Sequence, residues 1–378
     1  MEIYGLCDEK FASVREEFEK NFTERGDIGA SFALTIEGEY VVDIWAGTKD
    51  ATGTQAWQED TIVNVYSTTK TMTFLVALML ADRGQLDLNA PVASYWPEFA
   101  QQGKENIPVR FCLSHSAGLP GFSRPINPNE LYNWDFVTAE LAAQAPWWEP
   151  GTASGYHAIT QGFLIGEVVR RITGQTIGQY FKENVADVVN ADFHIGVDPK
   201  DFDRIASLVP VPASAPLMEI DPESMMAKVF ASTILPPGVT DTAAWRQAEI
   251  PAANGHGNAR SVVKAQTAMA NGGKAFGKEL LSEAGAKRAL EEQITGVDKV
   301  LLMPSRFAMG YSYSTDMIKM GPNPNTLWWG GAGGSTIVID TDAHLCFSYV
   351  MNQMKKTIVG DERGAKPMQA IYKSLGAT

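Results

Sequence analysis

The chain has 378 residues, which is enough for one large domain or two fused domains with a sizeable hydrophobic core. Hydrophobic residues make up 45% and charged residues 20% of the sequence, the proportions of an ordinary globular protein. A formal net charge of −13 argues against non-specific binding to nucleic acid or to an anionic membrane, so neither partner is expected.

Three cysteines, Cys7, Cys112 and Cys346, are odd in number and show no paired spacing, so no disulfide framework is expected. The first residues carry acidic side chains and lack the apolar core of a signal peptide. The longest apolar run, FLVALMLA at 74–81, is much shorter than a helix that spans a bilayer. These features predict a soluble, cytoplasmic protein.

The N-terminal part predicts a helix, a hairpin and a second helix. Residues 8–24 place phenylalanine and valine at helical spacing, which is typical of an amphipathic helix. Residues 31–47 form two β-rich runs around Glu37-Gly38, which favours a hairpin. The segment TIVNVYS then leads into an apolar helix that is expected to end at Gly84, a residue suited to the position after a helix.

The remaining chain divides into a helical part and a C-terminal β part. From about residue 105 to 300, helical patterns alternate with loops rich in proline and glycine, the longest at 208–224. Strands are expected again at 307–314 and in two nearly continuous apolar runs within 335–354, as in strands covered on both faces. A helix from about 361 closes the chain.

This order of elements predicts an α/β fold of the α+β kind. One antiparallel sheet would be built from both chain ends, residues 1–66 and 300–378, and flanked by the terminal helices. Residues 67–299 would form a mainly helical region beside it. The cleft between the two parts is the natural place for an active site.

The pair Ser67 and Lys70 opens the apolar helix and presents a hydroxyl and an amine on one face. The positive end of the helix favours a developing alkoxide, and an amine that loses hydration there can accept a proton. From this stretch alone, a serine cap with a snorkelling lysine is an equally good interpretation. A second match, Ser261 to Lys264, is interpreted as an N-cap with an exposed lysine.

Two further stretches supply candidates for a hydrolase site. Tyr156 follows a Pro-Gly loop and precedes a long amphipathic helix, so its phenol can point into a cleft, where nearby cations would depress its pKa. A buried tyrosine bound to a loop carbonyl is the commoner alternative. The segment LWWGGAGGSTIVID has four glycines before a strand, which fits either close approach to a ligand or a simple turn. The Gly-x-Ser-x-Gly elbow of α/β-hydrolases does not occur in the chain.

Taken in order, three motifs resemble those of the serine β-lactamase and penicillin-recognising superfamily. They are Ser67-Thr-Thr-Lys70, Tyr156-His-Ala158, and Trp329-Gly-Gly331 followed by AGGS. The resemblance is to the class C branch, most closely to the family VIII carboxylesterases, and it covers nearly the whole chain. It implies a fold like that of β-lactamases and DD-peptidases.

The resemblance also implies roles for individual residues. Ser67 would be the acylated nucleophile, Lys70 the adjacent base or proton store, and Tyr156 the second group for proton transfer. Which of Lys70 and Tyr156 takes the hydroxyl proton stays open. The oxyanion hole would consist of the backbone N–H groups of Ser67 and Ala332. The residues expected to bind the substrate are Trp329, Gly330, Gly331 and His157. No cofactor and no metal are expected.

The sequence departs from the β-lactamase pattern at two positions. Ala158 replaces an asparagine that contacts the substrate, and Trp329 replaces a lysine that binds the β-lactam carboxylate. Losing a charge-assisted contact of about 1.5–3 kcal/mol weakens anionic substrates about tenfold or more. We therefore expect a serine carboxylesterase for neutral esters with short acyl chains, with at most feeble β-lactam hydrolysis.

Other functions on the same fold remain as alternatives. They are an acyltransferase, an amidase or D-aminopeptidase, a weak β-lactamase, and a catalytically inactive penicillin-binding-like module. Against the inactive module stands the joint presence of Ser67, Lys70 and Tyr156. A structural role is the preferred interpretation for His115 and also for His157, which is alternatively placed to support Tyr156 by a hydrogen bond.

Overall fold

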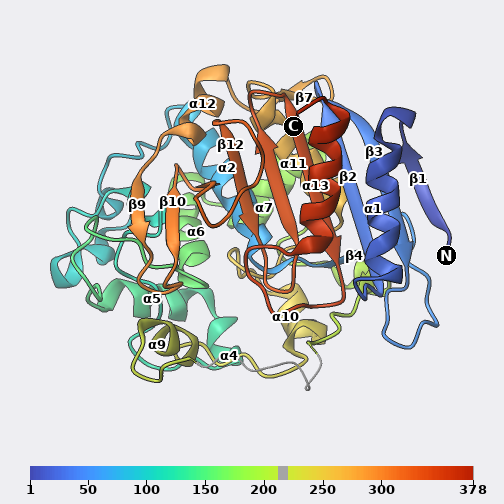
Figure 1. Ribbon diagram of the computed structural model, residues 1–378. Helices are drawn as coiled ribbons and strands as arrows, with labels where there is room; N and C mark the ends of the chain where they lie inside the picture. Colours follow the sequence, from blue (N-terminus) through green and yellow to red (C-terminus); the bar gives the residue numbers. More distant parts are fainter. Residues whose placement is uncertain (212–219, 378) are drawn as a thin grey trace.

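The computed structural model describes residues 1–211 and 220–377, and its centre is a nine-stranded sheet (Figure 1). The strand order is β1-β3-β2-β14-β13-β12-β11-β10-β9, and every neighbouring pair is antiparallel. Because β2 pairs with β14, the two chain ends build one sheet, which confirms the predicted fold class. The strands of the sheet are β1 (Ile3–Cys7), β2 (Gly29–Ile36), β3 (Glu39–Gly47), β9 (Ile294–Val297), β10 (Pro304–Phe307), β11 (Ser312–Tyr313), β12 (Thr326–Gly330), β13 (Thr336–Asp340) and β14 (Leu345–Met351).

Most of the α-helices lie between β3 and β9. The α-helices are α1 (Ala12–Thr23), α2 (Lys70–Asp82), α3 (Val109–Leu113), α4 (Pro128–Leu131), α5 (Trp134–Ala143), α6 (Thr160–Thr173), α7 (Ile177–Phe181), α8 (Asp187–Val189), α9 (Met225–Ala231), α10 (Ala243–Gln247), α11 (Ala259–Ala270), α12 (Glu283–Lys287) and α13 (Glu362–Ser374). A 3₁₀ turn, η2 (Tyr66–Thr69), precedes α2. The small strands are β4 (Ile62–Asn64), β5 (Ile205–Ala206), β6 (His256–Gly257), β7 (Lys274–Ala275) and β8 (Lys278–Glu279).

The predicted hairpin is formed by β2 and β3. Glu37 and Gly38 connect the strands, and both have a positive φ, as the two-residue turns that match strand twist require. The two apolar runs near the C-terminus are β13 and β14, and all of their residues are buried, as predicted for strands covered on both faces.

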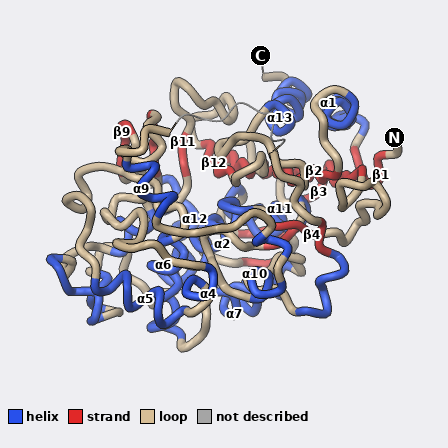
Figure 2. The backbone as a smooth tube through the Cα atoms, turned by 90° about the horizontal axis from the view of Figure 1, so that it is seen from below, coloured by secondary structure: helices blue, strands red, loops and turns tan. Residues whose placement is uncertain are grey.

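Helices cover both faces of the sheet, which gives three layers in Figure 2. The terminal helices α1 and α13 lie against each other on one face, while α11 packs on β14 and β2 from the opposite side. Helix α2 is buried from Lys70 to Ala81, so it forms the centre of the helical region. It ends at Asp82, and Gly84 takes a φ of +69°, as expected for a residue that follows a helix.

Several local features differ from the sequence-based expectation. Strand β1 escaped prediction because only Ile3 is buried in it, so it lacks an alternating pattern. Ser261 is not an N-cap: Asn258 holds that position, and Ser261 completes a capping box as the third residue of α11. Of the long loop predicted at 208–224, residues 212–219 lie outside the described part. The division into a sheet domain and a helical domain stays a prediction. Two elements of the predicted helical part, residues 67–299, lie with the sheet: α11 covers it and β9 is one of its strands.

Candidate active site

The nucleophile candidate Ser67 lies in η2, a turn with a strained residue beside it. Tyr66 has a φ of +44°, which is unfavourable for an aromatic side chain and occurs mostly where other contacts enforce it. Here the Val65 N–H donates to Gly255 O at 2.9 Å, and the Thr69 hydroxyl donates to Tyr66 O at 2.5 Å. These bonds fix the Ser67 hydroxyl just before the buried helix α2.

Lys70 begins α2 and is completely buried. Its Nζ lies 3.2 Å from Ser67 Oγ, 2.7 Å from Ala158 O and 2.9 Å from Ala252 O. Burial lowers the pKa of Lys70 well below its usual value. A neutral amine has two N–H donors and one lone pair, so the two carbonyls can take both donors and leave the lone pair facing the Ser67 hydroxyl.

Tyr156 meets Ser67 from the other side. Its phenol lies 2.7 Å from Ser67 Oγ, so the serine oxygen is within hydrogen-bond distance of both the phenol and the Lys70 amine. The expected depression of the Tyr156 pKa is wrong, because burial of the phenol raises it. The phenol is therefore protonated at neutral pH and acts as a hydrogen-bond donor.

The glycine-rich segment after β12 packs directly on the nucleophile turn. A Cβ at Gly331 would overlap Val65 O and Ser335 Oγ, so only glycine permits this approach. The Ser335 hydroxyl donates to Val65 O at 2.9 Å and lies 2.9 Å from Thr68 Oγ1. This packing places Ala332 and Ser67 on one cavity, and within the described residues their backbone N–H groups donate to no protein acceptor.

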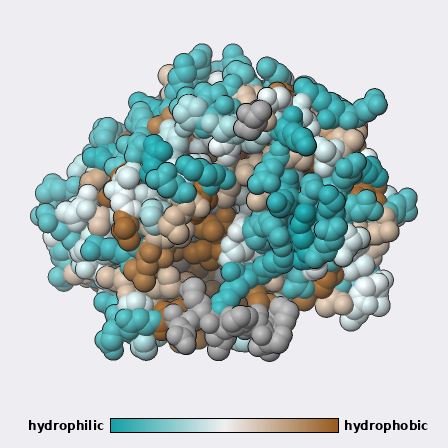
Figure 3. Space-filling model, in the orientation of Figure 1, coloured by the Kyte–Doolittle hydropathy of each residue, from teal (hydrophilic) through white to brown (hydrophobic). Residues whose placement is uncertain are grey.

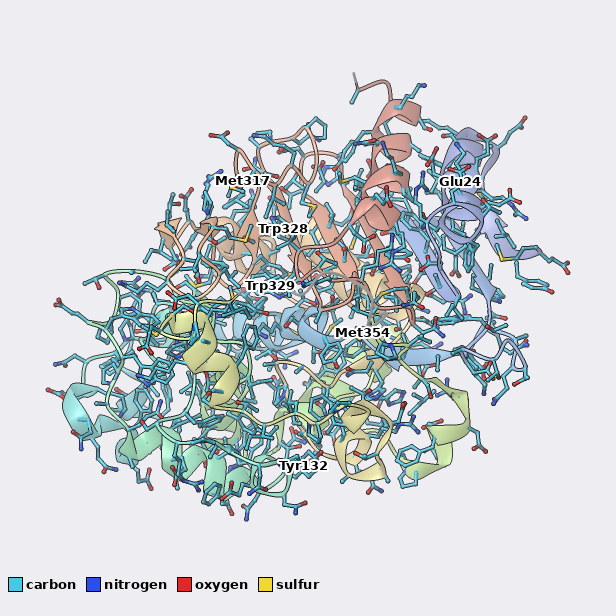
Figure 4. The ribbon with its side chains drawn as sticks, turned by 60° about the horizontal axis from the view of Figure 1, so that its bottom comes forward. Glu24, Tyr132, Met317, Trp328, Trp329 and Met354 are labelled. Carbon is cyan, nitrogen blue, oxygen red and sulfur yellow. The ribbon has the colours of Figure 1, made fainter. Side chains whose placement is uncertain are left out.

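Trp329 lies at the junction between the sheet and the helical region, as Figure 4 shows. Its indole stacks on His115, with ring centroids 5.4 Å apart and planes 19° apart, and its centroid lies 6.2 Å from that of Tyr156. Trp328, one residue earlier in β12, packs in the core on the opposite face of the sheet. The side chain of Trp329 is nearly all buried, so it forms a rigid apolar wall beside Tyr156.

His157 does not fit the substrate-binding role that the motif implied. It is completely buried, its Nε2 accepts from the Leu119 N–H at 3.0 Å, and its Nδ1 lies 2.6 Å from Gly155 O. Both ring nitrogens are therefore already paired with the backbone. The backbone N–H of His157 donates to His115 Nδ1 at 3.0 Å, so the two histidines support the loop that carries Tyr156. We remove His157 from the proposed substrate-binding residues.

Two cavities, both open to solvent, adjoin the reactive groups. Hydrophobic residues gather in a hollow near α9 and β10 in Figure 3. The first cavity contains Ser67 and Ala332, and Phe230 lies on it with 49% of its surface exposed. The second contains Trp329 and Phe307. Residues on these walls that no motif indicated are Val229, Phe230, Leu235, Leu301 and Ile358.

The described residues contain no group of three or more histidine, cysteine, aspartate or glutamate side chains arranged to hold a metal ion. Across residues 1–211 and 220–377, no helix has the length and apolar character needed to cross a membrane. The cytoplasmic location expected from the sequence stays a prediction.

A hydroxyl held between a buried amine and a phenol, beside a large antiparallel sheet, defines the class of serine hydrolases with a β-lactamase fold. The family model described as "Beta-lactamase" matches residues 18–366. The chain therefore belongs to the β-lactamase family.

Individual relatives agree with this family. The chain is 33% identical over 370 residues to the esterase/β-lactamase LipL of Mycobacterium tuberculosis, covering 94% of this chain and 84% of that protein. Among solved structures, a family VIII carboxylesterase has 40% identity and a TM-score of 0.93, covering 99% and 100% of the two chains. A penicillin-binding protein homologue from Caulobacter crescentus has 37% identity and a TM-score of 0.92, with the same coverage.

Proposed function

We propose that this protein is a serine carboxylesterase that hydrolyses short-chain neutral esters through an acyl-Ser67 intermediate. The observation that carries the proposal is the position of Ser67 Oγ, 3.2 Å from Lys70 Nζ and 2.7 Å from the Tyr156 phenol. The similarity to proteins named as esterases supports the same reaction class.

Acylation follows from these distances. Lys70 takes the Ser67 proton as Oγ attacks the ester carbonyl, and the N–H groups of Ser67 and Ala332 stabilise the resulting oxyanion. The ester C–O bond then breaks, and Tyr156 gives its proton to the departing alcohol. In deacylation the Tyr156 phenolate takes a proton from the attacking water. The Ser67 oxygen leaves with the proton held by Lys70, which restores the resting enzyme and releases the acid.

The walls of the cavities support the proposed substrate class. The site offers Trp329 and Ala158 where β-lactamases offer a lysine and an asparagine, and Lys70 is driven towards its neutral form by burial. An anionic substrate would therefore lose hydration without gaining a cation partner. A neutral ester loses little hydration and fits an apolar lining.

The decisive test combines a fluorophosphonate probe with an ester panel. We expect one adduct by intact mass in the native protein and none in Ser67→Ala. Ser261→Ala is the matched control, because it alters the second Ser-x-x-Lys and should keep the adduct. The panel contains p-nitrophenyl esters from acetyl to dodecanoyl, with nitrocefin alongside, and short esters should give the highest kcat/KM.

Several outcomes of this test would contradict the proposal or favour an alternative function. An adduct that persists in Ser67→Ala would contradict the proposal, as would equal kcat/KM on nitrocefin and on a short ester. Faster release of the acyl group by an added alcohol than by water would favour the acyltransferase. No adduct in the native protein would favour the inactive module.

A further inference from the structure

Residues 298–303 form a tight loop between β9 and β10. The Asp298 N–H donates to Met303 O at 3.0 Å, and the Leu302 N–H donates to Asp298 O at 2.9 Å. Leu302 has a φ of +57°, which is costly for a bulky side chain and persists only where other contacts hold the backbone. The loop is therefore held in one conformation by contacts that must offset this strain.

The strongest of these contacts come from the Asp298 carboxylate, which is completely buried. Its Oδ1 accepts from the backbone N–H groups of Tyr156 at 3.0 Å, Val300 at 2.9 Å and Leu301 at 2.8 Å. Its Oδ2 has no partner among the described residues, so Oδ1 alone offsets the cost of burying the group. One oxygen thus joins the loop to the backbone of Tyr156.

A second link runs in parallel with the first. The Lys299 N–H donates to Ser154 O at 2.9 Å, two residues before Tyr156. The segment 298–301 and the segment 154–156 are consequently tied at two points, which restricts both sliding and rotation between them. Tyr156 follows a loop rather than lying inside a helix, so its backbone depends on such outside contacts.

Leu301 lies between the two cavities and lines both of them. Together with Tyr156 and Ile358 it lines both of them, so these three side chains form the wall that the cavities share. The same carboxylate oxygen that holds Tyr156 also holds Leu301 through its N–H. One group therefore helps to hold both the residue that carries the phenol and Leu301 in this wall.

We propose that Asp298 is a positioning residue that locks the backbones of Tyr156 and Leu301 together, which keeps the phenol on Ser67 and fixes the wall between the two cavities. The inference rests on the proposed function, because it presumes that Tyr156 takes part in acyl transfer. It assigns to a buried carboxylate outside the three motifs a role in both turnover and acyl-chain selection.

The test compares Asp298→Ala and Asp298→Asn by kcat and KM on p-nitrophenyl acetate and octanoate. Alanine removes all three acceptor contacts, and a phenol displaced by about 1 Å lowers kcat about 100-fold. KM for the acetate should change little, while the ratio of kcat/KM between octanoate and acetate should shift because the Leu301 wall moves. Asparagine keeps an oxygen for the three N–H groups and should retain kcat within about tenfold.

Asp340→Ala is the matched control for loss of a buried carboxylate. Asp340 is also completely buried and holds loop N–H groups, those of Asp342 at 3.1 Å and Ala343 at 3.0 Å, but none of its partners lines either cavity. Rates are expressed per folded molecule, well below the melting temperature of each variant. Asp340→Ala should lower the melting temperature while kcat and the octanoate-to-acetate ratio stay as in the native protein.

The outcomes separate this inference from the proposed function. If Asp298→Ala keeps the native kcat and ratio, or if Asp298→Asn is as impaired as Asp298→Ala, the positioning role is overturned. If alanine prevents folding, Asp298→Glu decides: its displaced oxygens should cost at least about tenfold in kcat, and unchanged kcat overturns the role. Hydrolysis that persists in Ser67→Ala would instead overturn the proposed function.

Discussion

At the scale of single residues, burial acts on both groups that flank the Ser67 hydroxyl, Lys70 and Tyr156. Burial lowers the pKa of Lys70 and raises that of Tyr156, so each group favours the form without charge. The carbonyls of Ala158 and Ala252 orient the amine by accepting hydrogen bonds from its N–H groups. The resting chain of hydrogen bonds therefore runs from the phenol through the serine hydroxyl to the amine, which favours Lys70 as the base.

This arrangement predicts a pH profile that belongs to Lys70. The ratio kcat/KM should rise with pH as Lys70 loses its proton in the free enzyme, and it should level off well below about 10.4, where an exposed lysine titrates. Lys70→Arg should lower kcat/KM by about 10²–10⁴ at every pH, because arginine stays protonated. Tyr156→Phe should lower kcat while leaving the midpoint of this rise in place. A midpoint that moves in Tyr156→Phe would contradict the assignment.

At the scale of elements, the site depends on how closely β12 approaches η2. Gly331 touches the carbonyl of Val65, and Ser335 bonds to the same carbonyl, so the glycine-rich segment and the nucleophile turn form one unit. This contact keeps the N–H groups of Ser67 and Ala332 on the same cavity. A shift of either element would move one half of the proposed oxyanion hole away from the other.

Gly331→Ala tests this contact. The added Cβ would overlap two neighbouring oxygens, so β12 must move away from the turn, and we expect kcat to fall at least about 100-fold. Gly364→Ala in α13 is the matched control, since its Cβ would lie 3.6 Å from the nearest atom, an ordinary contact. The control should keep native kcat and gain up to about 1 kcal/mol in unfolding free energy. Native kcat in Gly331→Ala would refute the role of this contact.

The sequence predicted the elements whose own pattern determines them. Helix α1, the hairpin at Glu37-Gly38 and the buried pair β13 and β14 all follow from local periodicity or turn chemistry. Strands β1 and β9 were not predicted, and the strand expected at 307–314 is in fact the end of β10 and the short strand β11. These strands depend on pairing with neighbours rather than on their own side chains. The three motifs located Ser67, Lys70 and Tyr156, but the roles of these residues stay predictions.

The parts of the site that escaped prediction are those that arise only in space. Phe230 and Ile358 reach the same cavity from segments far apart in the chain, and nothing in their local sequence marks them. His157 shows the opposite case: its place in a motif indicated substrate binding, whereas burial and two backbone partners assign it to support of the loop. The partners of a side chain decide its role, and those partners are distant in sequence.

At the scale of the whole molecule, three buried histidines couple stability to pH. Burial lowers the pKa of His157 to about 3 and that of His256 to about 3, and it lowers the pKa of His115 well below its usual value. In the unfolded chain each imidazole titrates near about 6.5. Between about pH 6.5 and 3 the unfolded state therefore binds more protons than the native state. The contribution of these histidines to the free energy of unfolding therefore falls as the pH drops through this window.

The substitution His256→Gln tests the contribution of one of these histidines to the pH dependence of stability. We expect the free energy of unfolding to depend less steeply on pH below about 6.5, by up to about 1.4 kcal/mol per pH unit, although the variant is less stable at every pH. Urea unfolding between neutral and mildly acidic pH measures both slopes. Other groups that titrate there, such as Asp27 with a pKa raised to about 6 by burial, contribute equally to the two proteins. Parallel pH dependences would show that His256 titrates alike in both states.

The pairing of β2 with β14 has a consequence for biosynthesis. A ribosome delivers Ser67, Lys70 and Tyr156 well before residues 345–351 emerge to join the N-terminal hairpin to the strands that carry Gly331. Until then the edge of β2 lacks its hydrogen-bonding neighbour, which exposes the nascent chain to mispairing. We therefore expect the growing polypeptide to contain every reactive group and yet remain inert, with esterase activity appearing only after residues 345–351 have emerged and paired with β2.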